Sequence, residues 1–347
     1  MVKMINKIVT RMKKTWQVLR TGQLRSQELR QIPPISPEEV AEIRTFFPLD
    51  KFFIFGHARS GTTLLVRLVR LHPDVHCNYQ GHFFTRPPLL SGMAAEKRFE
   101  DWLKRPSNRW NRGRDMTPIA LRAMADFIME REARQEGKTI VGDKSPNVLL
   151  NGQAVREMAT FYPDARLVYI VRDGRDTLVS HRFQNFINGA AWLQGSDLAL
   201  RDAFAKDPTP FMSGQRSIFS EGTMRRMAEG WVKNVAETDR LGRQLYGSRY
   251  HVLKYEDLLK TPYQTISTLW QFLGADPTGL EEVVAGEMQQ NPDAAYQQEV
   301  AGDLVKNLEK GKRGSWRELF TEQDKRIFKE IAGETLVAWG YEKDLEW

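Results

Sequence analysis

The sequence predicts an α/β fold, with a central parallel β-sheet in a single domain and helices on both faces of the sheet. Short apolar runs typical of buried strands occur at residues 52–55, 139–141, 166–171 and 251–253. They alternate with segments whose apolar residues recur at helical spacing, as expected for parallel strands joined by crossover helices. Of the 347 residues, 41% are hydrophobic and 27% are charged, which excludes disorder throughout the chain.

A Pro-Pro pair separates a short arm, residues 1–35, from the main domain, residues 36–347. Ser36 followed by Glu39, with a proline between them, is the pattern of a capping box at the start of a helix. We therefore expect the domain to begin here.

Two segments of the domain, residues 81–115 and 189–222, have the composition of long loops. In an open parallel sheet such insertions tend to close over the carboxyl ends of the strands, where ligands bind. We expect them to form the walls of a ligand site.

The excess positive charge lies in the arm. The whole chain has a net charge of +7, and residues 1–30 contain eight Lys and Arg against the single acid Glu28, which accounts for all of it. A nucleic-acid-binding protein would carry its charge on the body of the fold, so we expect no nucleic-acid partner. The arm also has apolar residues at helical spacing, which predicts an amphipathic helix on an anionic membrane surface or a partner; a helix packed on its own domain is the alternative.

No apolar run approaches the roughly 18 to 20 residues that span a bilayer, and the N-terminus lacks the apolar core of a secretory signal. We expect a cytoplasmic protein, with peripheral membrane contact through the arm as the further option. Cys77 is the single cysteine, so no disulfide forms within the chain.

A glycine-bounded loop, Gly56–Thr63, connects the first predicted strand to a helix over residues 64–71. Its two glycines are five residues apart, as in the loop that gives P-loop proteins their name. Backbone N–H groups and the positive end of the helix dipole hold an anion at such a loop. Thr62 stands in place of the lysine that serves a nucleoside triphosphate, and Arg59 supplies a cation instead. The loop predicts a P-loop-like domain with a ligand other than a magnesium triphosphate.

These residues resemble the 5′-phosphosulfate-binding loop of sulfotransferases, which use 3′-phosphoadenylyl sulfate (PAPS) as sulfuryl donor. The continuation Leu71–Val75 resembles the protein-tyrosine sulfotransferase branch and related bacterial enzymes. The resemblance covers residues 50–342 and implies metal-independent sulfuryl transfer to a hydroxyl, or less readily an amine, with release of adenosine 3′,5′-bisphosphate (PAP). It assigns to the donor the loop residues Arg59, Ser60, Gly61, Thr62 and Thr63.

A second signature closes the strand 166–171. Ser180 follows Arg172 by eight residues, which resembles the arginine-serine pair that binds the 3′-phosphate in the family. An arginine at a strand end and a serine on the next helix can face one crevice and bind the same phosphate. The alternative is a salt bridge between Arg172 and Asp173, with Ser180 incidental.

Two further segments follow in the family's order. Lys254–Leu258 resembles the segment whose tyrosine, here Tyr255, lies beside the adenine. Near the C-terminus a basic segment resembles the one that closes over the nucleotide, although Glu309 stands where the family has arginine. Its residues assigned to the donor are Lys310, Gly311, Lys312 and Arg313, and a solvated basic loop is the alternative.

Sulfuryl transfer requires neutralisation of the leaving phosphate, alignment of the acceptor and removal of its proton. We assign the neutralisation to Arg59, the loop amides and Lys144, which lies in a segment resembling the family's lysine-containing one; an exposed, uninvolved Lys144 is the alternative. A sulfuryl group bears less charge than a γ-phosphate, so positioned N–H groups and cations suffice and we expect no metal.

The proton acceptor is harder to identify. In the tyrosine-sulfating pattern a glutamate follows Cys77 by two or three residues, but this chain has Gln80 there, which cannot accept a proton. We assign the role to His82, because an imidazole has a near-neutral pKa. Asp143 and His57 stay open, as does a structural role for His82.

The acceptor stays open too. Trp102 and Trp110 alternate with the cations Lys104, Arg105, Arg109, Arg112 and Arg114. Such a pattern favours a carbohydrate, an acidic peptide or an anionic lipid. The alternative is a solvated run of charge beside two buried tryptophans.

Two other functions compete with sulfuryl transfer. One is a P-loop kinase with Asp173 as a metal ligand, which Thr62 disfavours. The other is a catalytically idle family member that binds the nucleotide or a membrane, which the missing glutamate motivates.

Overall fold

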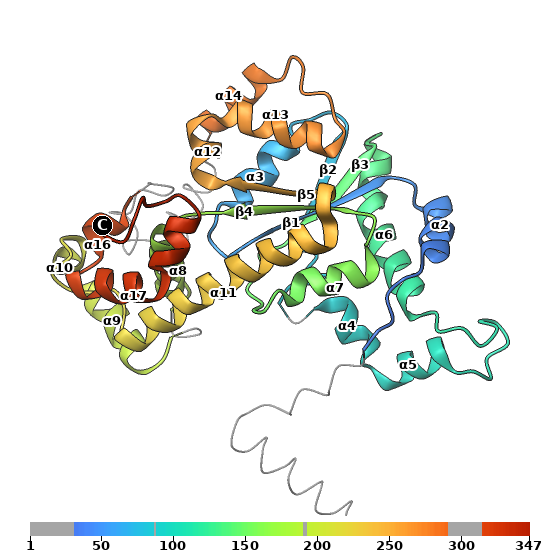
Figure 1. Ribbon diagram of the computed structural model, residues 1–347, viewed down its shortest axis with the longest axis horizontal. Helices are drawn as coiled ribbons and strands as arrows, with labels where there is room; N and C mark the ends of the chain where they lie inside the picture. The colour runs from blue at the N-terminus through green and yellow to red at the C-terminus, as the bar shows by residue number, and fades with distance from the viewer. Residues whose placement is uncertain (1–30, 87, 190–192, 291–313) are drawn as a thin grey trace, which may run out of the picture.

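The protein, seen in a computed structural model, has a five-stranded sheet at its centre (Figure 1). The structure describes residues 31–86, 88–189, 193–290 and 314–347. The strands are ordered β2-β3-β1-β4-β5 and every neighbouring pair is parallel. The strands are β1 (Asp50–Gly56), β2 (Val75–Tyr79), β3 (Ile140–Lys144), β4 (Arg166–Val171) and β5 (Tyr250–Lys254).

Helices cover both faces of the sheet, which confirms the predicted fold class (Figure 1). One face packs on a core that contains Val66, Ile170 and Trp270, and the other packs on a larger core that contains Phe53, Tyr169 and Trp231. The helices of the first face are α3 (Thr62–Val69), α12 (Tyr255–Lys260), α13 (Pro262–Leu273) and α14 (Glu281–Gln289). Those of the second are α6 (Thr117–Gln135), α7 (Gln153–Phe161), α11 (Glu221–Tyr246) and α17 (Glu322–Ala338).

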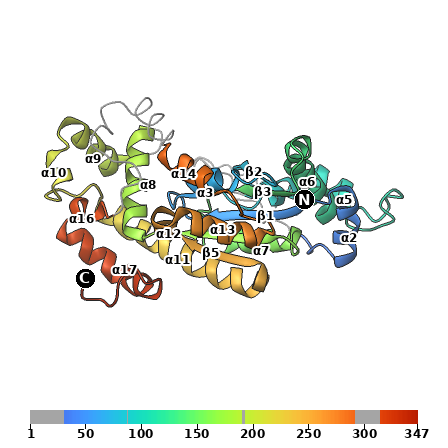
Figure 2. The same ribbon diagram turned by 90° about the horizontal axis from the view of Figure 1, so that it is seen from above.

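The remaining helices lie at the two ends of the molecule (Figure 2). One end holds α8 (Gly174–Asn188), α9 (Gly195–Lys206), α10 (Thr209–Met212) and α16 (Trp316–Leu319), and the 3₁₀ turn η2 (Gly247–Arg249) leads into β5. The other end holds α2 (Pro37–Phe46) and α5 (Lys97–Lys104), with α4 (Leu89–Ala94) beneath the second face. No helix in the described ranges is both long and apolar enough to cross a bilayer.

The order of the strands creates the crevice in which the site lies. The chain runs from β1 outward to β2, returns to β3 beside β1, and then crosses to β4 on the other side of β1. In a sheet of this kind the strand order reverses where the chain crosses from one side of the first strand to the other. The loops after the carboxyl ends of the strands diverge at that point and leave a crevice for a ligand. Here that crevice opens where β1, β3 and β4 end.

All four predicted strands are present: β4 has the predicted bounds, β1 and β5 are longer by one or two residues at each end, and β3 is shifted toward its C-terminal end. Helix α2 begins with the predicted capping box, in which Ser36 accepts from the Glu39 amide (3.2 Å) and Glu39 accepts from the Ser36 amide (3.0 Å). The sequence analysis missed β2. The two segments expected to be loop-rich contain short helices between their loops, namely α4 and α5 in one and α9 and α10 in the other. Nearly all of the predicted arm, residues 1–30, lies outside the described residues, and the domain boundary at residue 36 stays a prediction.

Candidate active site

The phosphate loop joins β1 to α3 through a backbone that turns its amides inward. Arg59 (φ 74°) and Gly61 (φ 89°) both have left-handed conformations, and the Ser60 amide donates to the His57 carbonyl (3.0 Å). Alternation of right- and left-handed residues directs successive N–H groups to one point, and the first amides of a helix have no acceptor within it. The loop is therefore built to hold an anion.

Gly61 is required by its surroundings as well as by its backbone angle. A Cβ at this position would lie 2.1 Å from the Cδ2 atom of Tyr255, which begins α12 directly after β5. The loop thus packs against the Tyr255 ring. Burial of this ring raises the pKa of its hydroxyl.

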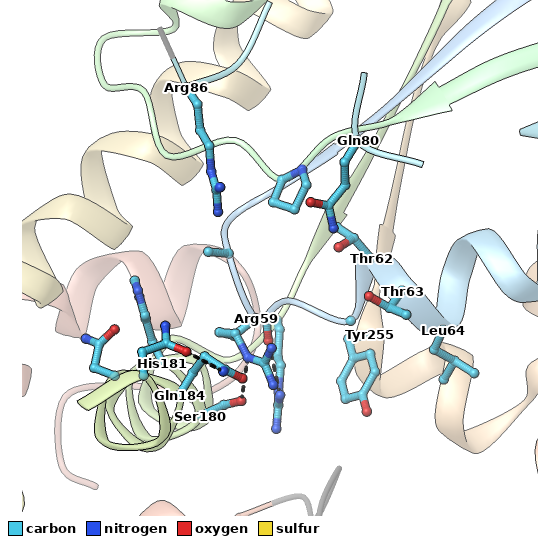
Figure 3. Close-up of a pocket in the computed structure, with 16 residues that line it drawn as sticks. Arg59, Thr62, Thr63, Leu64, Gln80, Arg86, Ser180, His181, Gln184 and Tyr255 are labelled. Carbon is cyan, nitrogen blue, oxygen red and sulfur yellow. Dashed lines mark hydrogen bonds between the residues drawn. The ribbon is translucent and has the colours of Figure 1, made fainter. Parts of the chain in front are cut away.

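Arg172 connects these elements. Its guanidinium donates to the carbonyl of Arg59 (3.2 Å) and lies over the ring of Tyr255, 4.7 Å from the ring centre. From the other side, Nε of Arg59 donates to the Ser180 hydroxyl (3.2 Å) on α8. The phosphate loop and the predicted arginine-serine pair are therefore in direct contact (Figure 3).

Asp173 does not pair with Arg172. Its carboxylate binds Arg175 (2.6 Å) and caps α8 by accepting from the Arg175 amide (2.9 Å). The alternative reading of Arg172 as half of a local salt bridge was therefore wrong. The same pairing occupies the carboxylate that a kinase would need as a metal ligand, and Asp173 does not line the cavity described next.

A cavity of about 340 Å³ lies over the phosphate loop, within the size range of small-molecule sites. Most predicted donor residues face it together, namely Arg59, Gly61, Thr62, Thr63, Arg172, Ser180 and Tyr255. Ser60 does not line it, because the side chain is buried behind the loop. Lys310, Gly311, Lys312 and Arg313 lie outside the described residues.

Gly314, which follows Arg313 in the chain, is bound close to the site. The Gly314 amide donates to a carboxylate oxygen of Asp176 (2.7 Å), and the Ser315 hydroxyl donates to the other (3.1 Å). Asp176 lies one helical turn before Ser180 on α8. The C-terminal segment is thus attached to the helix that provides Ser180.

Lys144 ends β3 and is fully buried, so the alternative of an exposed surface lysine was wrong. Its ammonium lies 5.2 Å from the centre of the Tyr79 ring, on the neighbouring strand. Lys144 is not among the residues that line the cavity.

The candidate bases lie around the cavity in different ways. His82 is partly buried, its Nδ1 is 2.8 Å from the Thr85 hydroxyl, and it does not line the cavity. Burial and the nearby charges of Arg86 and Lys144 lower the pKa of His82. His57 is buried with Nδ1 against the Ala58 carbonyl (2.9 Å), and burial lowers its pKa.

Asp143 acts on the loop after β2 rather than on the cavity. Its carboxylate accepts from the Gly81 amide (2.8 Å) and from the Ser145 hydroxyl (2.6 Å). Burial raises the pKa of Asp143 to about 6. Ser145 in turn accepts from the His82 amide (2.9 Å), so this network fixes the backbone that carries Gln80 and His82.

The sequence reading missed a histidine that does line the cavity. His181 follows Ser180 on α8, with its ring 6.0 Å from that of His57. Burial, assisted by the charges of Arg59 and Arg86, lowers the pKa of His181 to about 4. Also missed were Arg86 and three amide side chains of α8, Gln184, Asn185 and Asn188. For the residues of α8, spacing was a usable signal, because they lie on the same side of the helix as Ser180.

The two tryptophans of the basic segment are exposed, so the expectation of buried tryptophans was wrong. Trp102 is 55% exposed and Trp110 51%, and their rings stack with centres 5.0 Å apart. Trp102 is on α5 and Trp110 follows that helix. Helix α5 lies at the opposite end of the molecule from α8 (Figures 1 and 2). Neither tryptophan lines the cavity.

The model of the Sulfotransferase family matches residues 51–278, which is more than half of the chain. The chain belongs to this family. The matched range contains the phosphate loop, the arginine-serine pair and Tyr255, and the predicted resemblance is confirmed.

Among curated proteins, the chain is 32% identical over 131 residues to a protein-tyrosine sulfotransferase of Drosophila melanogaster, covering 37% of this chain and 24% of that protein. It is 23% identical over 189 residues to the human bifunctional heparan sulfate N-deacetylase/N-sulfotransferase 3, covering 53% and 19%. The matches span well under half the length of these relatives.

Among solved structures, the chain resembles mouse sulfotransferase SULT7A1 complexed with PAP, with a TM-score of 0.45 and 17% identity over 87% of this chain and 90% of that one. It also resembles a sulfotransferase from Alicyclobacillus acidocaldarius, with a TM-score of 0.39 and 20% identity over 77% and 98%.

Proposed function

We propose that the chain transfers the sulfuryl group of PAPS to a hydroxyl of an acceptor and releases PAP. One observation carries the proposal: the phosphate loop and the Arg172–Ser180 pair line a single cavity and touch each other through Arg59. PAPS has phosphate groups at the 3′ and 5′ positions of its ribose, and a cavity lined by both Arg59 and Arg172 offers a cation to each. In the transfer, the acceptor oxygen forms a bond to sulfur while the bond from sulfur to the 5′-phosphate oxygen breaks.

The donor end supplies the stabilisation of the leaving group. The loop amides and the Arg59 guanidinium face the place where negative charge grows on the 5′-phosphate, and fixed donors of this kind lower the barrier. Lys144 is proposed to add a positive charge from the end of β3, acting across the wall formed with Tyr79. No cluster of three metal-binding side chains occurs in the described part of the chain.

The rest of the nucleotide is proposed to bind between the strand ends. Arg172 and Ser180 bind the 3′-phosphate, and Tyr255 lies beside the adenine. Lys310, Gly311, Lys312 and Arg313 close over the nucleotide in this proposal. The attachment of Gly314 to Asp176 supports that role, because it brings the end of the segment to α8 beside Ser180.

Two histidines are candidates to accept the acceptor's proton. The sequence-based candidate is His82, with Gln80 orienting the acceptor. His181 is the candidate that we favour, because it lines the cavity and His82 does not. Its lowered pKa keeps the imidazole neutral, and able to accept a proton, above about pH 4.

The proposed activity is tested by calorimetry and by transfer. PAP should bind the full chain without magnesium, and ATP should not bind with or without it. Labelled PAPS should then pass its sulfur to acceptors from a pool. Magnesium-dependent ATP binding would favour the kinase instead, and PAP binding without transfer to any pool would favour the idle family member.

The proposed location is the cytoplasm, with the basic arm on an anionic membrane surface. The full chain should co-sediment with phosphatidylserine vesicles and lose that binding when residues 1–30 are deleted. Equal sedimentation of both forms would remove this role from the arm.

A further inference from the structure

The part of the cavity beyond the donor residues has a polar lining. Apart from Ala58, Leu64 and Pro146, these residues carry hydrogen-bonding or charged side chains: Gln80, Arg86, His181, Gln184, Asn185 and Asn188. Among the described residues, no carboxylate lines the cavity. An apolar acceptor would bury these groups without replacing the hydrogen bonds that they make with water.

Most of this lining is one face of α8. His181, Gln184, Asn185 and Asn188 are spaced by three or four residues, which places them on the same side of a helix. A carboxamide offers both donors and acceptors of hydrogen bonds, as does a hydroxyl group. A face with three carboxamides therefore matches a ligand with several hydroxyl groups.

Arg86 faces α8 from the loop after β2 (Figure 3). This loop holds three non-glycine residues in left-handed conformations, Gln80 (φ 56°), His82 (φ 49°) and Arg86 (φ 49°). Such conformations persist only where the surroundings enforce them, and they are concentrated at functional sites. Here the Gln80 amide donates to the Lys144 carbonyl and the His82 amide donates to the Ser145 hydroxyl. These bonds hold the backbone of the loop in place.

The charge of Arg86 reaches the acceptor side of the cavity. It contributes to the lowered pKa values of both His82 and His181, so its guanidinium lies within electrostatic range of each candidate base. The proposed function uses Arg59 and Arg172 for the two phosphates of the donor. Arg86 then remains as a cation beside the reacting hydroxyl.

Building on the proposed function, we propose that the acceptor is a hydroxyl-rich molecule with a negative charge of its own, an acidic sugar. Arg86 binds its carboxylate or phosphate group and the carboxamides of α8 bind its hydroxyls. Arg86 thereby determines specificity for the charged acceptor.

The test compares acceptors that are matched in shape and differ in charge. Transfer from labelled PAPS by the full chain is measured with glucuronic acid-containing and glucose-containing disaccharides, with glucose 6-phosphate and glucose, and with an acidic tyrosine peptide and a simple phenol. The variants are Arg86→Gln and, as a matched control, Arg131→Gln at an exposed arginine outside the cavity. PAP binding is measured for each by calorimetry.

We expect kcat/KM to be at least about tenfold higher for one or both acidic sugars than for the neutral partner. Arg86→Gln should remove that preference through KM, and it should leave transfer to the neutral sugars and PAP affinity unchanged. Arg131→Gln should change none of these quantities. Comparison of the glucuronic acid-containing disaccharide with glucose 6-phosphate shows whether the charged group of the acceptor is a carboxylate or a phosphate.

A preference for the peptide or the phenol would overturn the acceptor class, as would PAP binding without transfer to any sugar. Loss of activity in Arg86→Gln that is equal for charged and neutral sugars would overturn the role of Arg86. Failure of the wild-type chain to bind PAP would overturn the proposed function itself, and this result is distinguishable because it involves no acceptor.

Discussion

The donor end and the acceptor wall of the cavity are built differently. The donor end consists of residues at the ends of β1, β4 and β5, and they contact each other: Arg172 bonds the Arg59 carbonyl and stacks on Tyr255. The acceptor wall is one face of α8 and a strained loop after β2. The sheet fixes the first by strand register, whereas the second depends on side chains that can change without changing the fold.

The largest effect is expected from Gly61→Ala. A Cβ there would meet the Tyr255 ring at 2.1 Å at a backbone angle unfavourable for alanine, so the loop must move away from its anion-binding conformation. We expect PAP affinity to fall by about 100-fold or more, measured by calorimetry.

Gly137→Ala is the matched control for this variant. Gly137 has a similar left-handed angle (φ 68°), with nothing within 4 Å of the added Cβ. It should lose some stability and retain PAP affinity. Equal loss of affinity in both variants would mean that packing against Tyr255 does not shape the donor site.

Arg59→Gln should lower the rate of transfer by about 10²–10³-fold, because it removes a fixed cation from the leaving phosphate. Single-turnover transfer of labelled PAPS measures the chemical step. Arg131→Gln is the control, since the Arg131 side chain is 60% exposed. A rate within threefold of wild type would exclude Arg59 from leaving-group stabilisation.

The candidate bases give the next largest effect and address the acceptor side. We expect His181→Asn to lower kcat by about 10²-fold. The ring of His82 bonds Thr85, so we expect His82→Asn to lower kcat by less than about tenfold. Because the lowered pKa keeps His181 neutral, the wild-type rate should fall only as the pH approaches about 4. The reverse ranking of the two variants would return the role to His82.

The smallest effect concerns the support of the loop. The pKa of Asp143 is raised from 3.8 to about 6 by burial, so the folded state favours the protonated acid below that value. This stability is fully present below about pH 3.8 and is lost as the pH rises from there through about 6. Its upper limit is about 3 kcal/mol. Urea unfolding between about pH 3.5 and 8 should show this loss in the wild type and not in Asp143→Asn. Parallel curves for the two proteins would contradict this.

The residues predicted to bind the donor mostly line one cavity, because phosphate binding restricts residue type and spacing together. Strand 166–171 was predicted from an apolar run, and the pairing of Arg172 with Ser180 was implied by the resemblance to the sulfotransferases. The contact between Arg59 and Ser180 required knowledge of how β1 and β4 pair, which spacing alone does not provide.

Other elements were missed for physical reasons. Strand β2 contains His76 and Asn78 in place of apolar residues, and the buried His76 ring has Nδ1 3.1 Å from a carboxylate oxygen of Glu136. Arg86 belongs to no motif, and tertiary packing brings it to the cavity. One alternative placed the tryptophans of the basic segment in the interior, but they are about half exposed and stack on each other.

The central claim is that the phosphate loop and the Arg172–Ser180 pair bind opposite ends of one nucleotide. Calorimetry with PAP and with adenosine 5′-monophosphate, which lacks the 3′-phosphate, tests it in wild type, Arg172→Gln and Arg59→Gln. The account predicts that wild type prefers PAP by about 100-fold, that Arg172→Gln loses most of this preference, and that Arg59→Gln weakens both ligands alike. A preference for PAP that survives Arg172→Gln undiminished would contradict it.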